Sequence, residues 1–174
     1  MSDLIDLDPI LPKVTPKEYR QALGRFATGI AVITIMTENG PVGMTINSFA
    51  SVSLNPPLVL WSPDKSSKRY EAFMSAEHFA VHVLSDEQKD VCDGFARNAF
   101  AFSDFPHENN QHEVPLLKGC VAIFECRQYQ CLDGGDHTII LGEVEQARYK
   151  KANSLIYAHG SFSQTTNAQL DHAQ

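Results

Sequence analysis

Short hydroxyl and amide side chains are concentrated in one stretch of the chain, between residues 45 and 53. They are Thr45, Asn47, Ser48, Ser51 and Ser53, and apolar residues stand at about every second position between them. Alternate residues of an extended chain point to opposite faces. We therefore expect a row of hydrogen-bonding groups on one surface with apolar groups behind it. This uncharged surface suits a flat ligand with a polar edge, and by itself it is neither a phosphate clamp nor a metal site.

A second group of polar residues follows the turn that begins at Pro63. A helix is predicted from about Ser67 to Ser75, and its first turn carries Ser66, Ser67 and Lys68. Backbone amides at a helix N-terminus bind anions, and neighbouring hydroxyls and a lysine help. An ordinary serine cap gives the same pattern, so both interpretations stay open.

His137 stands where a Gly134-Gly135 turn passes into a strand. Glycines at such a turn let a ligand approach the backbone closely, although a lone histidine there is also compatible with a structural role. No nucleophile stands beside a general base at a recognisable spacing, and neither Gly-x-Ser-x-Gly nor Gly-x-Gly-x-x-Gly occurs. The pattern therefore favours binding over acid–base chemistry.

No metal site is predicted, because the histidines are scattered and no cysteine–histidine group has zinc-finger spacing. The four cysteines, Cys92, Cys120, Cys126 and Cys131, form no Cys-x-x-Cys pair. We expect them to be reduced thiols in a cytoplasmic protein.

The composition is that of an ordinary soluble domain, with 43% hydrophobic and 20% charged residues among 174. A net charge of −7 argues against a nucleic-acid surface. No apolar run is long enough for a membrane span, and residues 1–13 lack the pattern of a secretory signal. We predict one domain over residues 15–163, with an N-terminal arm at 1–14 and a flexible tail at 164–174.

Strands dominate the predicted secondary structure. The expected ranges are 30–37, 42–47, 51–54, 58–62, 78–84, 120–130 and 138–149. Tight turns such as Asn39-Gly40 and the hairpin at 133–136 imply antiparallel pairing. Closing such a sheet into a barrel removes its edges. The predicted fold class is mainly β with inserted helices.

Two further helices are expected, one before the strand at 30–37 and one after the strand at 78–84. Thr15, Pro16 and Glu18 form a capping box that predicts a helix from about residue 16 to 28, with Gly29 as its end. A second capping box at Ser85 predicts a helix to about residue 96. The loop that follows carries Phe100, Phe102 and Phe105, which form either a lid over a ligand or a cluster that anchors the loop.

Four segments, residues 26–34, 43–62, 78–84 and 135–144, resemble the short-chain flavin reductase family, with the motifs in order over about residues 18–162. That family includes the reductase components of two-component flavin monooxygenases. The resemblance implies an antiparallel split β-barrel homodimer that binds FMN or FAD near the subunit interface. It also implies reduction of flavin by NADH or NADPH, and release of reduced flavin to a partner monooxygenase.

The resemblance also implies roles for individual residues. The isoalloxazine and ribityl contacts fall on Thr45, Ile46, Asn47 and Ser48, and the adjoining flavin contacts fall on Ser51, Val52 and Ser53. The flavin phosphate falls on Ser62, Ser66 and Ser67, and His137 falls near the nicotinamide. Hydride transfer requires stacked rings rather than an acid–base pair, which agrees with the residues present.

The sequence departs from the family pattern at two places. His82 stands where the family has asparagine, and residues 157–162 follow the family's aromatic–glycine–aromatic end only loosely. Two alternatives to a reductase stay open: a non-catalytic flavin-binding protein for storage or sensing, and a haem or pyridoxal-phosphate oxidase role on the same fold.

Overall fold

The computed structural model describes residues 15–165. The predicted N-terminal arm and residues 166–174 of the predicted tail lie outside the described residues. Strand β12 spans Ser161–Gln164, so only its last residue falls within the range predicted as a tail.

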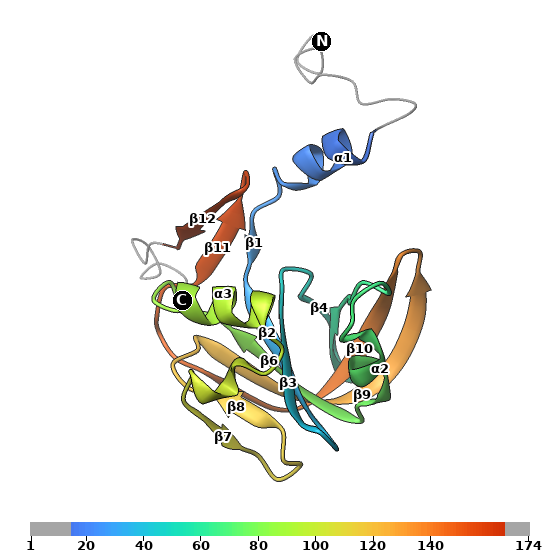
Figure 1. Ribbon diagram of the computed structural model, residues 1–174, viewed down its shortest axis with the longest axis vertical. Helices are drawn as coiled ribbons and strands as arrows, with labels where there is room; N and C mark the ends of the chain where they lie inside the picture. Colours follow the sequence, from blue (N-terminus) through green and yellow to red (C-terminus); the bar gives the residue numbers. More distant parts are fainter. Residues whose placement is uncertain (1–14, 166–174) are drawn as a thin grey trace.

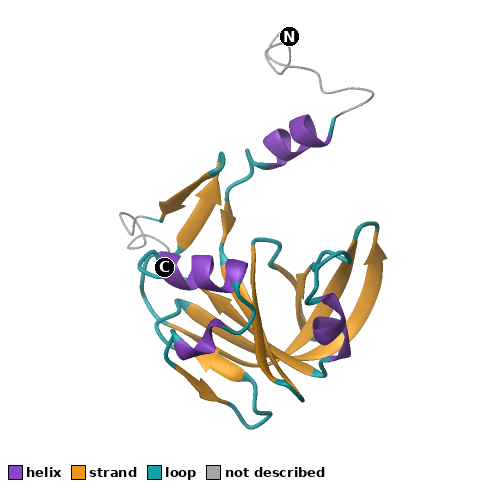
Figure 2. Ribbon diagram, viewed as in Figure 1, coloured by secondary structure: helices purple, strands orange, loops and turns teal. Residues whose placement is uncertain are grey.

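One seven-stranded antiparallel sheet dominates the molecule (Figures 1 and 2). Its strands follow the order β3-β2-β6-β9-β10-β5-β4. Their bounds are Ala31–Thr37 (β2), Gly40–Ile46 (β3), Ala50–Leu54 (β4), Pro57–Trp61 (β5), His78–Val83 (β6), Ala122–Gly134 (β9) and His137–Tyr149 (β10). Each strand overlaps one of the seven predicted ranges, and all are joined by antiparallel pairing as predicted.

The two edge strands of this sheet, β3 and β4, are consecutive in the chain and are separated only by residues 47–49. Each residue of an extended chain spans at most about 3.3–3.6 Å, so one end of the sheet must curve until its edges come near each other. The edges do not pair with each other in the described sheet. The result is a rolled sheet that is split between β3 and β4.

The interior of the roll is apolar. Trp61 of β5 is buried and makes edge-to-face contacts with Phe73 and Phe79, at centroid distances of 5.2 and 6.0 Å. Phe73 comes from α2, which spans Tyr70–Ser75. Helix α2 is shorter than the helix predicted from about Ser67 to Ser75, because it begins three residues later.

The other face of the sheet is covered by α3 (Lys89–Arg97), the short helix η1 (Ala101–Ser103) and the hairpin of β7 (His107–Asn109) and β8 (Pro115–Leu117). Phe102 and Phe105 pack against Phe95 of α3, with ring centroids 4.8 and 5.6 Å apart. These two aromatics anchor the loop. Phe100 is 60% exposed.

The first helix, α1, spans Pro16–Leu23 and has the predicted capping box between Thr15 and Glu18. It ends earlier than predicted because the Gly24 amide closes the last turn onto backbone carbonyls, and the chain then enters β1 (Thr28–Gly29). Strand β1 pairs with β11 (Leu155–Ala158), which pairs with β12 (Ser161–Gln164). Helix α1 stands apart from the main sheet and buries none of its residues (Figure 1).

Only one of the two hydrogen bonds of the second predicted capping box is present. Helix α3 begins at Lys89, and no side chain caps its N-terminus. The Gln88 side chain does accept a hydrogen bond from the Ser85 amide at 3.1 Å, which is the reciprocal half of a capping box.

None of the helices within residues 15–165 is long and apolar enough to cross a membrane.

Gly43 of β3 lies directly beneath Phe95 of α3. A Cβ atom at residue 43 would stand 2.4 Å from Phe95 Cδ1, and Phe95 is fully buried. Because overpacking a core costs about 1–3 kcal/mol, Gly43→Ala should lower the free energy of unfolding by that amount in denaturant titration.

Gly29→Ala is the matched control, because a Cβ atom there meets nothing within 4 Å. Its stability should change by less than about 0.5 kcal/mol. Equal effects of the two substitutions would contradict the close approach of α3 to β3.

Candidate functional site

Two adjoining cavities lie along β3 and α3, the first also bordering the turn before α2 and the second bordering β11 and β12. The first, of about 390 Å³, is lined by Met44, Thr45, Ser67, Lys68, Arg69 and Ala96. The second, of about 260 Å³, is lined by Ile30, Thr45, Ile46, Asn47, Cys92, Asp93, Ala96, Tyr157 and Phe162. Because Thr45 and Ala96 line both, we treat the two as one elongated site and call it the Thr45 site.

Thr45 is fixed by the helix that covers it. Its hydroxyl donates a 2.7 Å hydrogen bond to the backbone carbonyl of Cys92 in α3. A hydroxyl that donates one hydrogen bond can still accept others, so its oxygen can receive a donor from a ligand. Asn47, two residues further along, is exposed. The first part of the predicted polar row therefore lines a cavity.

The rest of that row is divided between two places. The Ser48 hydroxyl accepts a hydrogen bond from the Ser62 amide at 3.0 Å, which joins the β3–β4 connection to the end of β5. Ser51 and Val52 of β4 are exposed, and the Ser53 hydroxyl accepts from the Asn55 amide at 3.2 Å. The residues of β4 line neither cavity of the Thr45 site.

Ser66 and Ser67 lie in a turn and not on a helix N-terminus. The amide and hydroxyl of Ser66 both donate to Asp64 Oδ1 at 2.7 Å, which lowers the pKa of that carboxyl group. The Ser67 hydroxyl accepts from the Arg69 amide at 3.2 Å. Helix α2 begins only at Tyr70 and has no side-chain cap, so the predicted placement of these two serines at a helix start is wrong, while their role in phosphate binding stays a prediction.

Arg69 supplies the positive charge that sequence reasoning assigned only to Lys68. Its guanidinium donates to the carbonyls of Gly43 at 3.1 Å, Phe95, and Ala96 at 3.3 Å. Burial lowers the pKa of Arg69, although a guanidinium keeps its charge in proteins. Arg69 thus fastens the turn to β3 and α3 and makes one end of the Thr45 site cationic. An arginine directly after the Ser-Ser-Lys sequence was the available signal.

His137 lies at the first position of β10, beside the loop that carries Ser66. It forms an isolated bridge with Asp64, and its Nδ1 atom is 2.8 Å from Asp136 Oδ1. The Lys65 ammonium bonds to Asp133 and to the Gly135 carbonyl, which ties the same loop to the hairpin tip. The structure therefore brings His137 close to the turn that carries Ser66 and Ser67, which we call the serine turn. It does not bring His137 into the lining of the Thr45 site.

The comparisons with known proteins assign this chain to a family. Residues 23–166 match the family described as the flavin reductase like domain, so the chain belongs to that family. This confirms the resemblance drawn from the four sequence motifs.

Individual relatives are similar over most of the chain. An FMN reductase (NADH), SmoA, of Agrobacterium fabrum is 52% identical over 146 residues, covering 84% of each protein. A structure of the Streptomyces globisporus NADH:FAD oxidoreductase SgcE6 in complex with NAD and FAD fragments superposes with a TM-score of 0.84 at 34% identity, covering 91% of this chain and 99% of the other. The predicted mainly β, antiparallel fold class is thereby confirmed.

Some relatives are longer than this chain. The reductase component of a flavin-dependent trigonelline monooxygenase of Acinetobacter baylyi is 40% identical over 157 residues, which cover 89% of this chain and 51% of that protein. This chain therefore spans about half the length of that relative.

Proposed function

We propose that this protein is an NADH-dependent flavin reductase that reduces FMN or FAD and supplies the reduced flavin to a partner monooxygenase. The observation that carries the proposal is family membership over residues 23–166. It is supported by 52% identity to a protein named as an FMN reductase (NADH) and by 40% identity to a monooxygenase reductase component.

The Thr45 site fits a flavin at both ends. Ile46, Tyr157 and Phe162 offer apolar contacts for a flat ring, and Thr45 and Asn47 stand at its polar edge. At the other end, Ser67 with Lys68 and Arg69 offers a hydroxyl and two cations for a phosphate. When bound, the flavin supplies the hydride acceptor, and these side chains orient it.

We propose that three further serines support this site without contacting the flavin: Ser48, Ser62 and Ser66. Their hydrogen bonds fix the β3–β4 connection and the serine turn. Ser51, Val52 and Ser53 of β4 are proposed to contact the ligand from the opposite edge of the split sheet.

A homodimer is supported by the face of α1 that nothing covers within the described chain. Tyr19 and Leu23 of α1 are 57% and 55% exposed, Phe26 just beyond the end of the helix is 78% exposed, and α1 buries none of its residues. Amphipathic helices bury their apolar stripe, and we propose that a second copy of the chain covers it.

Four free cysteines support a reducing, cytoplasmic location.

His137 is proposed to position the nicotinamide. His137→Ala should raise the KM for NADH more than the KM for flavin, because the ring lies outside the Thr45 site but beside its serine turn. Steady-state kinetics with each substrate varied in turn measures the two constants. Equal changes in both would count against this assignment. Asp136→Asn, which alters only the partner of the imidazole, should give a smaller change of the same kind.

Anaerobic mixing separates a reductase from a flavin-binding protein. Under anaerobic conditions a reductase bleaches added FMN or FAD as NADH is consumed, one flavin for each NADH. A storage or sensor protein would keep its flavin oxidised and retain it through gel filtration. Retention of yellow flavin without consumption of NADH would favour that alternative.

A further inference from the structure

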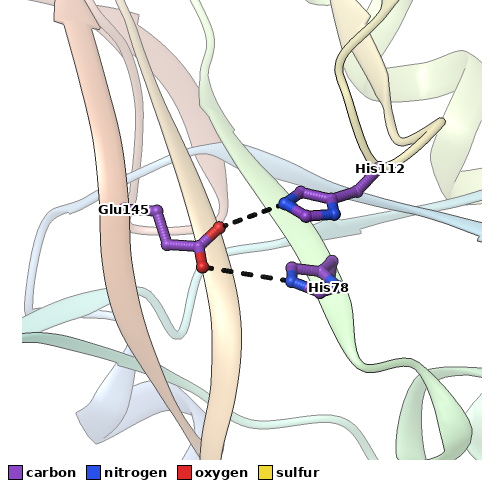
Figure 3. A group of neighbouring side chains, drawn as sticks. All are labelled: His78, His112 and Glu145. Atoms are coloured by element: carbon purple, nitrogen blue, oxygen red, sulfur yellow. Dashed lines mark ion pairs between the residues drawn. The ribbon is translucent and has the colours of Figure 1, made fainter.

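Three side chains from distant parts of the sequence meet on the sheet face that the β7–β8 hairpin covers. They are His78 at the start of β6, His112 in the loop between β7 and β8, and Glu145 of β10. Figure 3 shows both imidazoles lying one above the other, each with a nitrogen directed at the Glu145 carboxylate. One ligand atom from each residue lies within 4.8 Å of the others.

The distances within this group are too long for hydrogen bonds. His78 Nε2 is 4.0 Å from Glu145 Oε1, and His112 Nε2 is 3.6 Å from Oε2, whereas N–H···O bonds span about 2.7–3.2 Å. With metal–ligand bonds of about 2.0–2.2 Å, neighbouring atoms around a tetrahedral ion stand roughly 3.4 Å apart. The His112 distance is close to this spacing, and the His78 distance is about 0.6 Å longer. His112 Nε2 also lies 3.1 Å from the Gln111 side-chain nitrogen, which a bound ion would displace.

Neighbouring carboxylates on these strands are neutralised differently. Glu125 has Arg148 at 2.6 Å, and Glu143 has Arg127 at 2.6 Å. Glu145 has only the two imidazoles as basic neighbours within 4.0 Å among residues 15–165. It is the carboxylate of this group that is left without an arginine.

The backbone is shaped to bring these ligands together. Glu145 is the extra residue of a β-bulge, because Val144 and Gln146 pair with consecutive residues of β9, and bulges re-aim side chains next to functional sites. On the opposite side, the Asn110 side chain accepts hydrogen bonds from the amides of His112 and Val114. These bonds hold the loop in the form that places His112 over His78.

We propose that His78, His112 and Glu145 bind a divalent first-row transition ion such as Zn²⁺. Imidazole and carboxylate are ligands that suit this class of metal. The ion joins the β7–β8 hairpin to strands β6 and β10. It requires the imidazole rings, now 3.7 Å apart and 8° from parallel, to rotate so that both nitrogens face one point, and histidine χ2 angles vary broadly. The proposal departs from the sequence-based expectation of no metal site, because no local spacing connects these three residues.

The test is titration of Co²⁺ or Zn²⁺ into chelator-treated, full-length protein. Calorimetry measures the binding of either ion, and the visible spectrum reports the ligands of the cobalt form. One ion should bind per chain, without the strong absorption of cobalt bound to thiolate. His112→Ala and Glu145→Gln should each weaken binding more than tenfold, because even residues that only support metal ligands change affinity by about 10–100-fold.

Glu143→Gln is the matched control, since it removes a carboxylate two residues away on the same strand that is paired with Arg127. It should leave the affinity unchanged. The proposal is overturned if no ion binds, if the spectrum shows thiolate ligation, or if the Glu143→Gln and Glu145→Gln variants bind equally well. These readouts do not involve flavin or NADH, so their outcome is independent of the proposed reductase activity.

Discussion

Replacement of Arg69 by alanine should lower the free energy of unfolding by about 2–3 kcal/mol and raise the KM for flavin at least tenfold. The guanidinium donates to carbonyls of β3 and of the last turn of α3, and hydrogen bonds to charged groups contribute about 1.5–3 kcal/mol. A cation at a helix C-terminus is also favoured by the helix dipole. The same side chain lines the Thr45 site, so its loss both loosens the walls and removes a charge.

Two variants separate these contributions. Arg69→Lys keeps the charge but not the planar fork that reaches several carbonyls, so it should recover part of the flavin affinity and less of the stability. Lys68→Ala removes an exposed cation that lines the same cavity, and it should raise the KM for flavin with little change in stability. Denaturant titration and steady-state kinetics measure both quantities. Unchanged stability in Arg69→Ala would contradict the fastening role.

The second large effect is a loss of stability in mild acid caused by His82. This side chain is fully buried in β6, and burial lowers its pKa from 6.5 to about 4. Its Nδ1 atom is 3.0 Å from the Val32 carbonyl, while Nε2 has no hydrogen-bond partner among the described residues. The folded protein therefore holds this imidazole neutral.

The direction of the pH dependence follows from these two values. Above pH 6.5 the imidazole is neutral in both states and does not affect stability. As pH falls below 6.5 the unfolded chain binds a proton that the folded chain excludes until about pH 4, so the free energy of unfolding falls by about 3 kcal/mol over that window.

His82→Asn tests this assignment, because asparagine does not titrate and can still donate to the Val32 carbonyl. The free energy of unfolding, measured by denaturant titration between pH 7 and pH 4, should fall more steeply in the wild type than in the variant. Parallel pH curves would show that His82 is not responsible.

Much of the fold could be predicted because its signals are local. Strand β2 consists of β-branched and apolar residues, Asn39-Gly40 marks its turn, and Thr15 with Glu18 caps α1. Helix ends were less predictable. The Ser66-Ser67 sequence looks like a cap, but Ser66 is held by Asp64, and the regular helix begins only at Tyr70.

The candidate site could be predicted only in part, for a similar reason. Thr45 and Asn47 follow from strand alternation and do line a cavity. Arg69 acts through carbonyls that are distant in sequence, and the joining of His78, His112 and Glu145 depends on a bulge and a loop. Such contacts arise from tertiary packing, which residue spacing along one chain does not encode.

The most direct test of the central claim is the steady-state rate of NADH and NADPH oxidation with FMN and with FAD, measured in all four combinations. We predict flavin-dependent oxidation of NADH, with a rate that saturates in both the nicotinamide and the flavin. Absence of flavin-dependent oxidation with either nicotinamide would contradict the assignment of this protein as a flavin reductase.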